Sequence, residues 1–421
     1  MTDNMENKKE RAVLAGLSAA SMEPGERSSD VSMDELAALV ETAGGEAVAV
    51  VMQNRSTPDP RSFLGDGKVQ ELKELIEANA CDLAVFDNEL SPSQMRVLSQ
   101  ELGVKVLDRA GLILDIFAQR ARTREGQLQV ELAQYNYLLP RLVGMWTHLE
   151  RQEGAIGTRG PGETQLETDR RHIRRKIQKL EEELEQVRRV RSTQRRRREK
   201  NAMPVAALVG YTNAGKSTLL NHLTGADIPA NNRLFDTLDT TTRRLKLAEA
   251  QEVLLSDTVG FIRKLPTHLI EAFKATLEEL KYADVLLHVI DLSNPEWMSQ
   301  AEIVESLIVQ LGAEQTPCIR VYNKCDTFSG LLPRDKDSVC ISARTGEGCD
   351  TLLEMLSEKL DNGKRRVTLH IPYSRGDILE LLHREAVVLD IEYTDDCTVV
   401  KAIVKPELWG RVSPFSQPAP Q

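Results

Sequence analysis

The segment Val205-Ala-Ala-Leu-Val-Gly210-Tyr-Thr-Asn-Ala-Gly215-Lys216-Ser217 decides the fold. Its apolar start predicts a buried strand, and Leu219, Leu220 and Leu223 repeat at helical spacing directly after it. The loop between them fits the pattern G-x-x-x-x-G-K-[ST], in which backbone N–H groups surround phosphates. With a strand before it and a helix after it, the match predicts a phosphate-binding loop at the start of an α/β domain.

A second motif, Asp257-Thr258-Val259-Gly260, follows a predicted hairpin of Leu245–Ala248 and Val253–Ser256. Downstream of a phosphate loop, this placement makes the otherwise common D-x-x-G pattern specific. Lys216 would reach the β- and γ-phosphates, and Ser217 and Asp257 would hold Mg²⁺. The Gly260 N–H would contact the γ-phosphate.

A third motif, Asn323-Lys324-Cys325-Asp326, follows the apolar run Cys318–Tyr322. A carboxylate at Asp326 can accept from N1–H and the exocyclic amine of guanine, whereas adenine offers no such donor pair and would leave the carboxylate unpaired. We expect Asn323 at the base edge, the Lys324 stem along the purine, and Ser342-Ala343 closing the pocket. The ordered motifs predict a protein that binds GTP in preference to ATP.

The run Phe235–Asp239, with Thr240–Thr242 after it, has the position of a first switch segment. One threonine must complete the Mg²⁺ shell, but spacing does not choose among the four, and a threonine-rich turn can also be purely structural. Phe261 follows Gly260, where Ras-like proteins use a glutamine to orient the attacking water. Phenylalanine cannot do this, so we expect slow intrinsic hydrolysis that another group or a partner assists. Asn213 suggests one such group, a K⁺ ion beside the phosphates.

Composition narrows the class of protein. A chain of 421 residues suggests two to four domains, and no apolar run is long enough to span a membrane. The six cysteines are scattered without C-x-x-C spacing, which indicates reduced thiols and no structural zinc. We expect a cytoplasmic protein, a monomer, without a membrane-spanning segment; peripheral membrane association stays open. The net charge of −10 argues against nonspecific binding of nucleic acid by the whole surface.

Patterning along the chain predicts the domain organisation. We expect an α/β fold: a P-loop GTPase domain preceded by a small α/β domain with a helical hairpin and followed by a small α+β domain. The predicted divisions are a disordered extension at 1–44, an α/β domain at 45–125, a hairpin and basic linker at 126–200, the GTPase domain at 201–363, the α+β domain at 364–412 and a disordered tail at 413–421.

Two heptad seams predict the hairpin, because apolar residues repeat at alternating spacings of four and three over 128–149 and again over 173–187. Pro140 should kink or break the first helix. The tip Gly154–Glu163 holds four glycines, which suit either a flexible connector or a close approach to a ligand beside Arg159. Residues 169–200 carry fourteen Lys or Arg against six Asp or Glu, so this stretch is locally basic despite the net charge.

Motifs outside the nucleotide site resemble those of the HflX family of translation-factor-class GTPases, over about residues 46 to 363. The marks are Pro60-Arg-Ser-Phe-Leu-Gly-Asp-Gly-Lys-Val69, Asp108-Arg109, Gln134-Tyr-Asn-Tyr-Leu-Leu-Pro-Arg-Leu142, Gly157-Thr-Arg-Gly-Pro-Gly-Glu-Thr-Gln-Leu-Glu167 and Phe235-Asp-Thr-Leu-Asp239. The resemblance favours Thr237 as the Mg²⁺ threonine, because the family ligates the metal there. Asp236 departs from the small residue that is usual at its position.

The resemblance also implies partners: the large ribosomal subunit or the ribosome, ribosomal RNA, and GTP or GDP. It implies a role in separating stalled ribosomes, with the N-terminal domain and hairpin reaching toward the peptidyl-transferase region. The C-terminal unit resembles a small ferredoxin-like appendage. Two alternatives stay open: a GTPase serving ribosome assembly or RNA modification, and a nucleotide-gated scaffold with negligible turnover.

The expected site residues fall into three groups. Catalysis is assigned to Lys216, Thr237 and Gly260, and Mg²⁺ binding to Ser217, Thr237 and Asp257. The residues expected to contact the nucleotide are Gly210, Tyr211, Thr212, Asn213, Ala214, Gly215, Lys216, Ser217, Phe235, Asp236, Thr237, Leu238, Asp239, Asp257, Thr258, Val259, Gly260, Asn323, Lys324, Cys325, Asp326, Ser342, Ala343 and Arg344.

Overall fold

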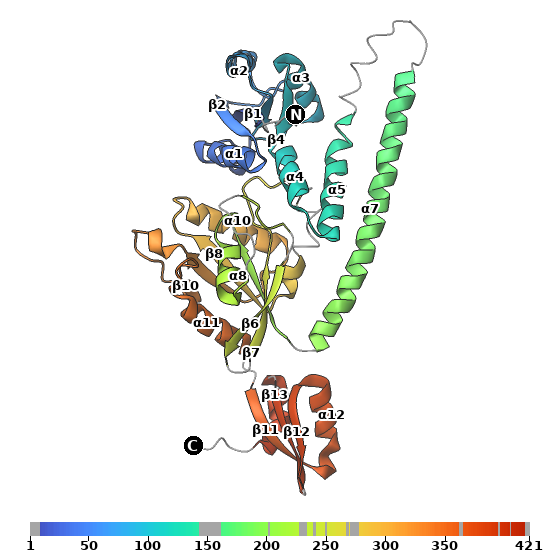
Figure 1. Cartoon of the computed structure of the whole chain (residues 1–421), viewed down its shortest axis with the longest axis vertical. Helices are drawn as coiled ribbons and strands as arrows, with labels where there is room; N and C mark the ends of the chain where they lie inside the picture. The colour runs from blue at the N-terminus through green and yellow to red at the C-terminus, as the bar shows by residue number, and fades with distance from the viewer. Residues whose placement is uncertain are drawn as a thin grey trace, which may run out of the picture.

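The computed structural model describes residues 9–142, 161–200, 203–226, 234–238, 241–248, 251–266, 269, 278–361, 365–394, 396–404 and 406–416. These residues form an N-terminal, a central and a C-terminal domain, each built on its own sheet, with a long helix alongside (Figure 1). None of the described helices combines the length and apolarity that a bilayer crossing requires. All six cysteines are free thiols.

The N-terminal domain is a parallel sheet covered by helices on both faces. Its strands lie in the order β2-β1-β3-β4. Helices α1 and α4 cover one face, and α2 and α3 cover the other, because their apolar side chains join two separate clusters on opposite sides of the sheet. The element bounds are β1 Arg11–Ala19, α1 Asp30–Thr42, β2 Glu46–Arg55, α2 Asp66–Asn79, β3 Leu83–Phe86, α3 Pro92–Leu102, β4 Lys105–Asp108 and α4 Arg109–Arg120.

The predicted disordered extension at 1–44 is wrong over residues 11–42. Strand β1 occupies an inner position of the sheet, between β2 and β3. Residues 12–17 of this strand are fully or almost fully buried, as expected for a parallel strand covered on both faces, which lacks the alternating pattern. Helix α1 begins at a capping box in which the side chains of Ser29 and Ser32 accept from each other's backbone N–H. The polar composition of this region concealed both elements.

The predicted hairpin is present as α5, Arg124–Leu138, packed antiparallel against α7, Pro161–Lys200. Arg124 pairs with Glu183, and Lys176 Nζ lies 3.2 Å from Glu131, so sequence numbers run in opposite directions along the two helices. The buried seam contains Leu128, Leu180 and Leu184, with Leu132, Tyr135 and Val187 at its margin. The heptad prediction is therefore confirmed along this seam.

Helix α5 ends at Leu138, before Pro140, as predicted. The rest of the first seam beyond residue 142, and the tip residues 154–160, lie outside the described part of the chain.

The central domain has a six-stranded sheet in the order β10-β9-β8-β5-β7-β6, in which only β6 is antiparallel to its neighbour. Helices α8 and α11 pack on one face and α10 on the other. The predicted hairpin is confirmed as β6 and β7. The bounds are β5 Val205–Gly210, α8 Lys216–Thr224, β6 Thr241–Ala248, β7 Gln251–Asp257, β8 Val285–Asp291, α10 Trp297–Gln310, β9 Cys318–Asn323, β10 Ser338–Cys340 and α11 Cys349–Asp361.

The C-terminal domain is an antiparallel sheet in the order β11-β13-β12 with one face covered by α12. It matches the small α+β domain that was predicted at 364–412. The bounds are β11 Arg365–Pro372, α12 Gly376–Glu385, β12 Val387–Tyr393, β13 Cys397–Val404 and α13 Pro406–Val412.

The predicted disordered tail is wrong over residues 413–416. Ser416 forms a bridge with Leu369 of β11, and the Arg375 guanidinium lies 5.3 Å from the Phe415 ring centroid. One aromatic side chain therefore anchors a segment whose proline and serine content suggests disorder.

Candidate active site

Two glycines of the phosphate loop are required by close contacts. Strand β5 ends at Gly210, where an added Cβ would lie 2.3 Å from the Val289 carbonyl oxygen. Gly215 has a φ of +93°, and a Cβ there would lie 2.2 Å from Asn323 Nδ2. Any side chain at either position would collide with the neighbouring strand or the base-binding loop. The loop conformation thus follows from the two glycines.

Lys216 is buried at the start of α8, and its Nζ donates to the carbonyl oxygens of Gly210, at 3.1 Å, and Tyr211, at 2.8 Å. Burial lowers the pKa of Lys216 to about 8, although Asp257 opposes the shift. A phosphate anion held in the loop would raise this pKa again, because it favours the charged form.

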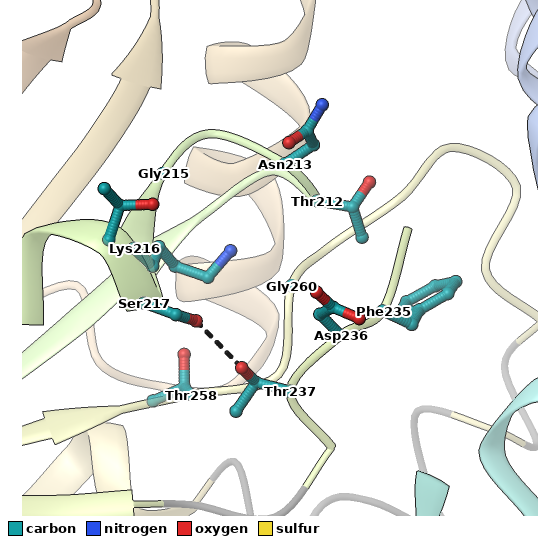
Figure 2. A pocket seen from close by; sticks show the side chains of 11 residues that line it. Thr212, Asn213, Gly215, Lys216, Ser217, Phe235, Asp236, Thr237, Thr258 and Gly260 are labelled. Carbon is teal, nitrogen blue, oxygen red and sulfur yellow. Dashed lines mark hydrogen bonds between the residues drawn. The ribbon is translucent and has the colours of Figure 1, made fainter. Parts of the chain in front are cut away.

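The three predicted metal ligands converge beside Lys216. Ser217 Oγ lies 2.7 Å from Asp257 Oδ2 and 2.8 Å from Thr237 Oγ1 (Figure 2). Asp257 is fully buried, burial raises its pKa, and its Oδ1 has no hydrogen-bond partner among the described residues. An oxygen-only donor set with a free buried carboxylate oxygen fits Mg²⁺. When bound, this ion would supply positive charge beside the phosphates.

The geometry also compares three of the four threonines that spacing left open. Thr237 reaches the metal-ligand group, whereas Thr241 and Thr242 belong to β6 and pair with β7. Thr242 Oγ1 lies 3.4 Å from Ser256 Oγ. Thr240 and the predicted contact residue Asp239 lie outside the described residues.

The segment after Asp257 is held against the phosphate loop by backbone hydrogen bonds. Phe261 N donates to Gly210 O at 3.1 Å, and Thr212 N donates to Phe261 O at 2.7 Å. A Cβ on Gly260 would lie 2.9 Å from Thr212 Cα and 3.1 Å from Lys216 Nζ. The Phe261 side chain is 1% exposed and lies in the core. A group that orients the attacking water must therefore come from elsewhere.

The base-binding loops border a cavity of about 380 Å³ at the carboxyl ends of β9 and β10. Asp326 lies at this cavity, and Arg344 Nη2 donates to its Oδ2 at 2.6 Å. Hydrogen bonding from Ser342 and the charge of Arg344 lower the pKa of Asp326, so the carboxylate is an acceptor at neutral pH. Lys324 Nζ lies 2.6 Å from Asp291, which places the lysine stem along the cavity.

Asn323 has a structural role in addition to the one predicted. Its Nδ2 donates to Ala214 O at 2.8 Å, and its Oδ1 accepts from Ala343 N at 2.9 Å. The side chain is buried and joins the phosphate loop to the base-binding loop. Its amide therefore holds two loops together, a role that the motif did not predict. Asn323 also lines the cavity, and its contact with the base edge stays a prediction. Cys325 begins a 3₁₀ helix and is not among the residues that line the cavity.

Three of the predicted nucleotide contacts have side chains that face the N-terminal domain. Tyr211 Oη donates to Glu35 at 2.6 Å, the Phe235 ring meets Phe117 edge-on at 4.8 Å, and Asp236 pairs with Arg120 at 3.4 Å. Figure 2 shows Phe235 pointing away from Lys216. At positions 211 and 235, it is the backbone that can contact a nucleotide. The sequence motifs gave no indication of this second role.

Comparison with known proteins matches three family models to consecutive parts of the chain. Residues 30–118 match a GTP-binding GTPase N-terminal region, 120–198 a GTP-binding GTPase middle region, and 205–324 a 50S ribosome-binding GTPase. GTPase HflX from Lacrimispora saccharolytica is 48% identical over 420 residues, covering 98% of each chain. GTPase HflX from Escherichia coli is 47% identical over 351 residues, covering 82% of each chain.

The chain belongs to the HflX family of GTPases. As a member of this family, it is a GTP-hydrolysing enzyme. Among solved structures, a GTP-binding protein from Sulfolobus solfataricus in complex with GDP is 24% identical, with a TM-score of 0.45, covering 83% of this chain and 98% of that one.

One HflX mark, the dipeptide Asp108-Arg109, has a clear structural role. Asp108 caps α4 by accepting from Gly111 N at 2.9 Å. It also accepts from Tyr137 Oη at 2.7 Å and from Arg141 Nη2 at 3.2 Å, both of which belong to another HflX mark. Arg109 pairs with Glu35 at 2.7 Å and with Asp87 at 2.8 Å, both in its own domain. These two carboxylates contact Tyr211 and Lys264 of the GTPase domain. The dipeptide thus contacts the hairpin directly and the GTPase domain through Glu35 and Asp87.

Proposed function

We propose that this protein is a ribosome-binding GTPase that uses GTP binding and hydrolysis to separate stalled ribosomes into subunits. The observation that carries the proposal is the exposed basic surface of α7. Arg171, Arg174, Arg175 and Lys179 are exposed there, while the apolar seam of the same helix is covered by α5. Such a helix can neutralise phosphates without reading sequence, as a ribosomal RNA partner requires.

The matching family models support the ribosome as the partner, since residues 205–324 match a 50S ribosome-binding GTPase. We propose the large subunit as the site of binding, Mg²⁺ as the cofactor at Ser217, Thr237 and Asp257, and the cytoplasm as the location. Hydrolysis should be slow until the ribosome or a bound K⁺ contributes a group, because Phe261 is buried and its side chain has no hydrogen-bonding atom.

The binding test changes Arg171, Arg174 and Arg175 to glutamine. Co-sedimentation with ribosomes should weaken, and the slope of log affinity against log salt should become shallower by roughly 0.7–0.9 for each phosphate that the variant no longer neutralises. The matched control changes Arg334 and Lys336, exposed on a GTPase-domain loop, in the same way. Equal slopes for the hairpin variant and the parent would contradict RNA binding by α7.

The activity test replaces Gly157, Gly160 and Gly162 of the predicted tip by alanine. Basal GTP hydrolysis should remain, and subunit splitting, followed by sedimentation with a non-hydrolysable GTP analogue, should be impaired. Normal splitting would mean that the tip is only a connector. Association with precursor particles in place of mature ribosomes would favour a role in assembly. Absence of ribosome-stimulated hydrolysis would favour the scaffold.

A further inference from the structure

The N-terminal and GTPase domains meet at a cluster of charged and polar side chains that the nucleotide chemistry does not use. This interdomain cluster consists of Glu35 from α1, Asp87 directly after β3, Arg109 at the start of α4, Tyr211 from the phosphate loop and Lys264 from the segment after Gly260. Its members are distant in sequence, and the Asp87–Lys264 contact joins residues 177 positions apart.

Asp87 lies at the centre of the cluster. Its Oδ1 pairs with Arg109 Nη1 at 2.8 Å, and its Oδ2 accepts from Lys264 Nζ and from the hydroxyl of Ser28 at 2.7 Å. The side chains of Asp87, Arg109 and Lys264 are 0%, 2% and 10% exposed. Burial alone would raise the pKa of Asp87, but Arg109 and Lys264 outweigh it and the pKa is lowered. The cluster is therefore a buried carboxylate held by two cations.

The cluster is connected to the nucleotide site at two points. Lys264 follows Gly260 in the segment that would sense the γ-phosphate. Tyr211 Oη donates to Glu35 Oε1 at 2.6 Å and accepts from Arg263 N at 2.8 Å, so one hydroxyl joins the phosphate loop, the segment after Gly260 and α1. A displacement of residues 263–264 must break or rebuild these contacts.

Helix α4 also contacts the first switch segment at its other end. Phe117 packs edge-on against Phe235, and Arg120 pairs with Asp236 at 3.4 Å. Asp236 directly precedes Thr237, whose hydroxyl lies at the metal-ligand group. Helix α4 thus contacts the first switch segment directly and the segment after Gly260 through Asp87, and both segments are expected to change with the nucleotide.

We propose that Asp87 and Lys264 are positioning residues that couple the state of the bound nucleotide to the N-terminal domain. Separating the two partners of a buried ion pair is costly, because each partner is left as an uncompensated charge. Lys264 is therefore expected either to pair with Asp87 or to leave the buried site. The pair is intact in a structure where Thr237 lies at Ser217 and Asp257. The interdomain cluster and the arrangement that would bind GTP should therefore stabilise each other, as linkage requires. This inference does not depend on the ribosomal role.

The test compares Lys264→Met with Lys359→Met. Lys359 is the matched control, because its Nζ also pairs with an aspartate, Asp337, at 2.8 Å, but on the GTPase-domain surface. The ratio of affinities for a non-hydrolysable GTP analogue and for GDP is measured by titration. We expect Lys264→Met to lower this ratio at least ten-fold, Lys264→Arg to retain most of it, and Lys359→Met to leave it within two-fold. An unchanged ratio in Lys264→Met overturns the proposal.

A second variant tests whether the pair itself is responsible. Asp87→Asn leaves Lys264 and Arg109 without their shared carboxylate, so it should lower the ratio of the two affinities more than Lys264→Met does. The double variant Asp87→Asn, Lys264→Met should have a higher ratio than Asp87→Asn alone. Additive effects would overturn a direct pair. If Asp87→Asn does not fold, the coupling is tested instead by measuring the rate of backbone hydrogen exchange in α4 of the parent protein. Exchange should be slower with the GTP analogue than with GDP, and equal rates would contradict the coupling.

Discussion

Replacing Asn323 by alanine tests whether this side chain joins two loops of the nucleotide site. The change removes the hydrogen bonds to Ala214 O, at 2.8 Å, and from Ala343 N, at 2.9 Å. Both backbone groups are buried, and leaving such a group unpaired costs about 1–3 kcal/mol. The variant should therefore lose roughly 2–6 kcal/mol, shared between the free energy of unfolding and nucleotide binding.

The assay measures the melting temperature and GDP affinity of the same samples. For a domain of this size, 2 kcal/mol corresponds to a fall of about 4–8 °C, and GDP affinity should fall at least about ten-fold because both loops relax. Asn294→Ala is the control, since Asn294 Oδ1 accepts a local bond from Glu296 N at 2.9 Å in the same domain. A melting temperature and GDP affinity equal to those of the parent would refute the reasoning.

Four further experiments test the rest of the site. Asp326→Asn should weaken GTP binding and relax selectivity toward xanthine nucleotides, because an amide cannot accept from both guanine donors; unchanged GTP affinity in a competition titration would contradict the base pocket. Lys216→Ala and Ser217→Ala should abolish hydrolysis while circular dichroism stays unchanged, and hydrolysis at the parental rate would exclude the assigned roles. Affinity for GDP should fall about ten-fold between pH 7 and pH 9, because the pKa of Lys216 is about 8 in the free protein and phosphates raise it on binding; a flat titration would show that the lysine stays charged throughout. If Asn213 helps to hold K⁺, hydrolysis should be faster in potassium than in sodium buffer, and equal rates would dismiss that idea.

The nucleotide site was predictable because each of its motifs is short and adjoins a strand or helix in the sequence. A strand followed by Gly210–Ser217 and a helix can fold in few ways, and Asp257 and Asp326 each follow a strand of the same sheet. Chain order alone then brings their carboxyl ends to one edge. The choice of Thr237 needed family resemblance, because spacing treats neighbouring threonines alike.

The N-terminal elements and the interdomain cluster were not predictable in this way. The apolar run of strand β1 lies within a polar region, so composition concealed it. The partners of Asp87 come from α4 and from a loop of another domain, and no local pattern encodes the docking of two domains. Asp108-Arg109 was singled out by resemblance, but its function becomes visible only when both domains are in place.

The length of α7 gives the hairpin a mechanical property. At 1.5 Å per residue, its 40 residues extend about 60 Å, while its apolar seam against α5 contains Leu180, Leu184 and Val187. The helix is joined to α4 through the short connection into α5. Because Arg124 pairs with Glu183, this connection lies beside residue 183 of α7, about 33 Å from the helix start at Pro161. A rotation of about 5° there would move the helix start by roughly 3 Å, the rise of two helical residues. Under the proposed coupling, a small shift beside the bound phosphates would be carried along α7 to a point far from the nucleotide.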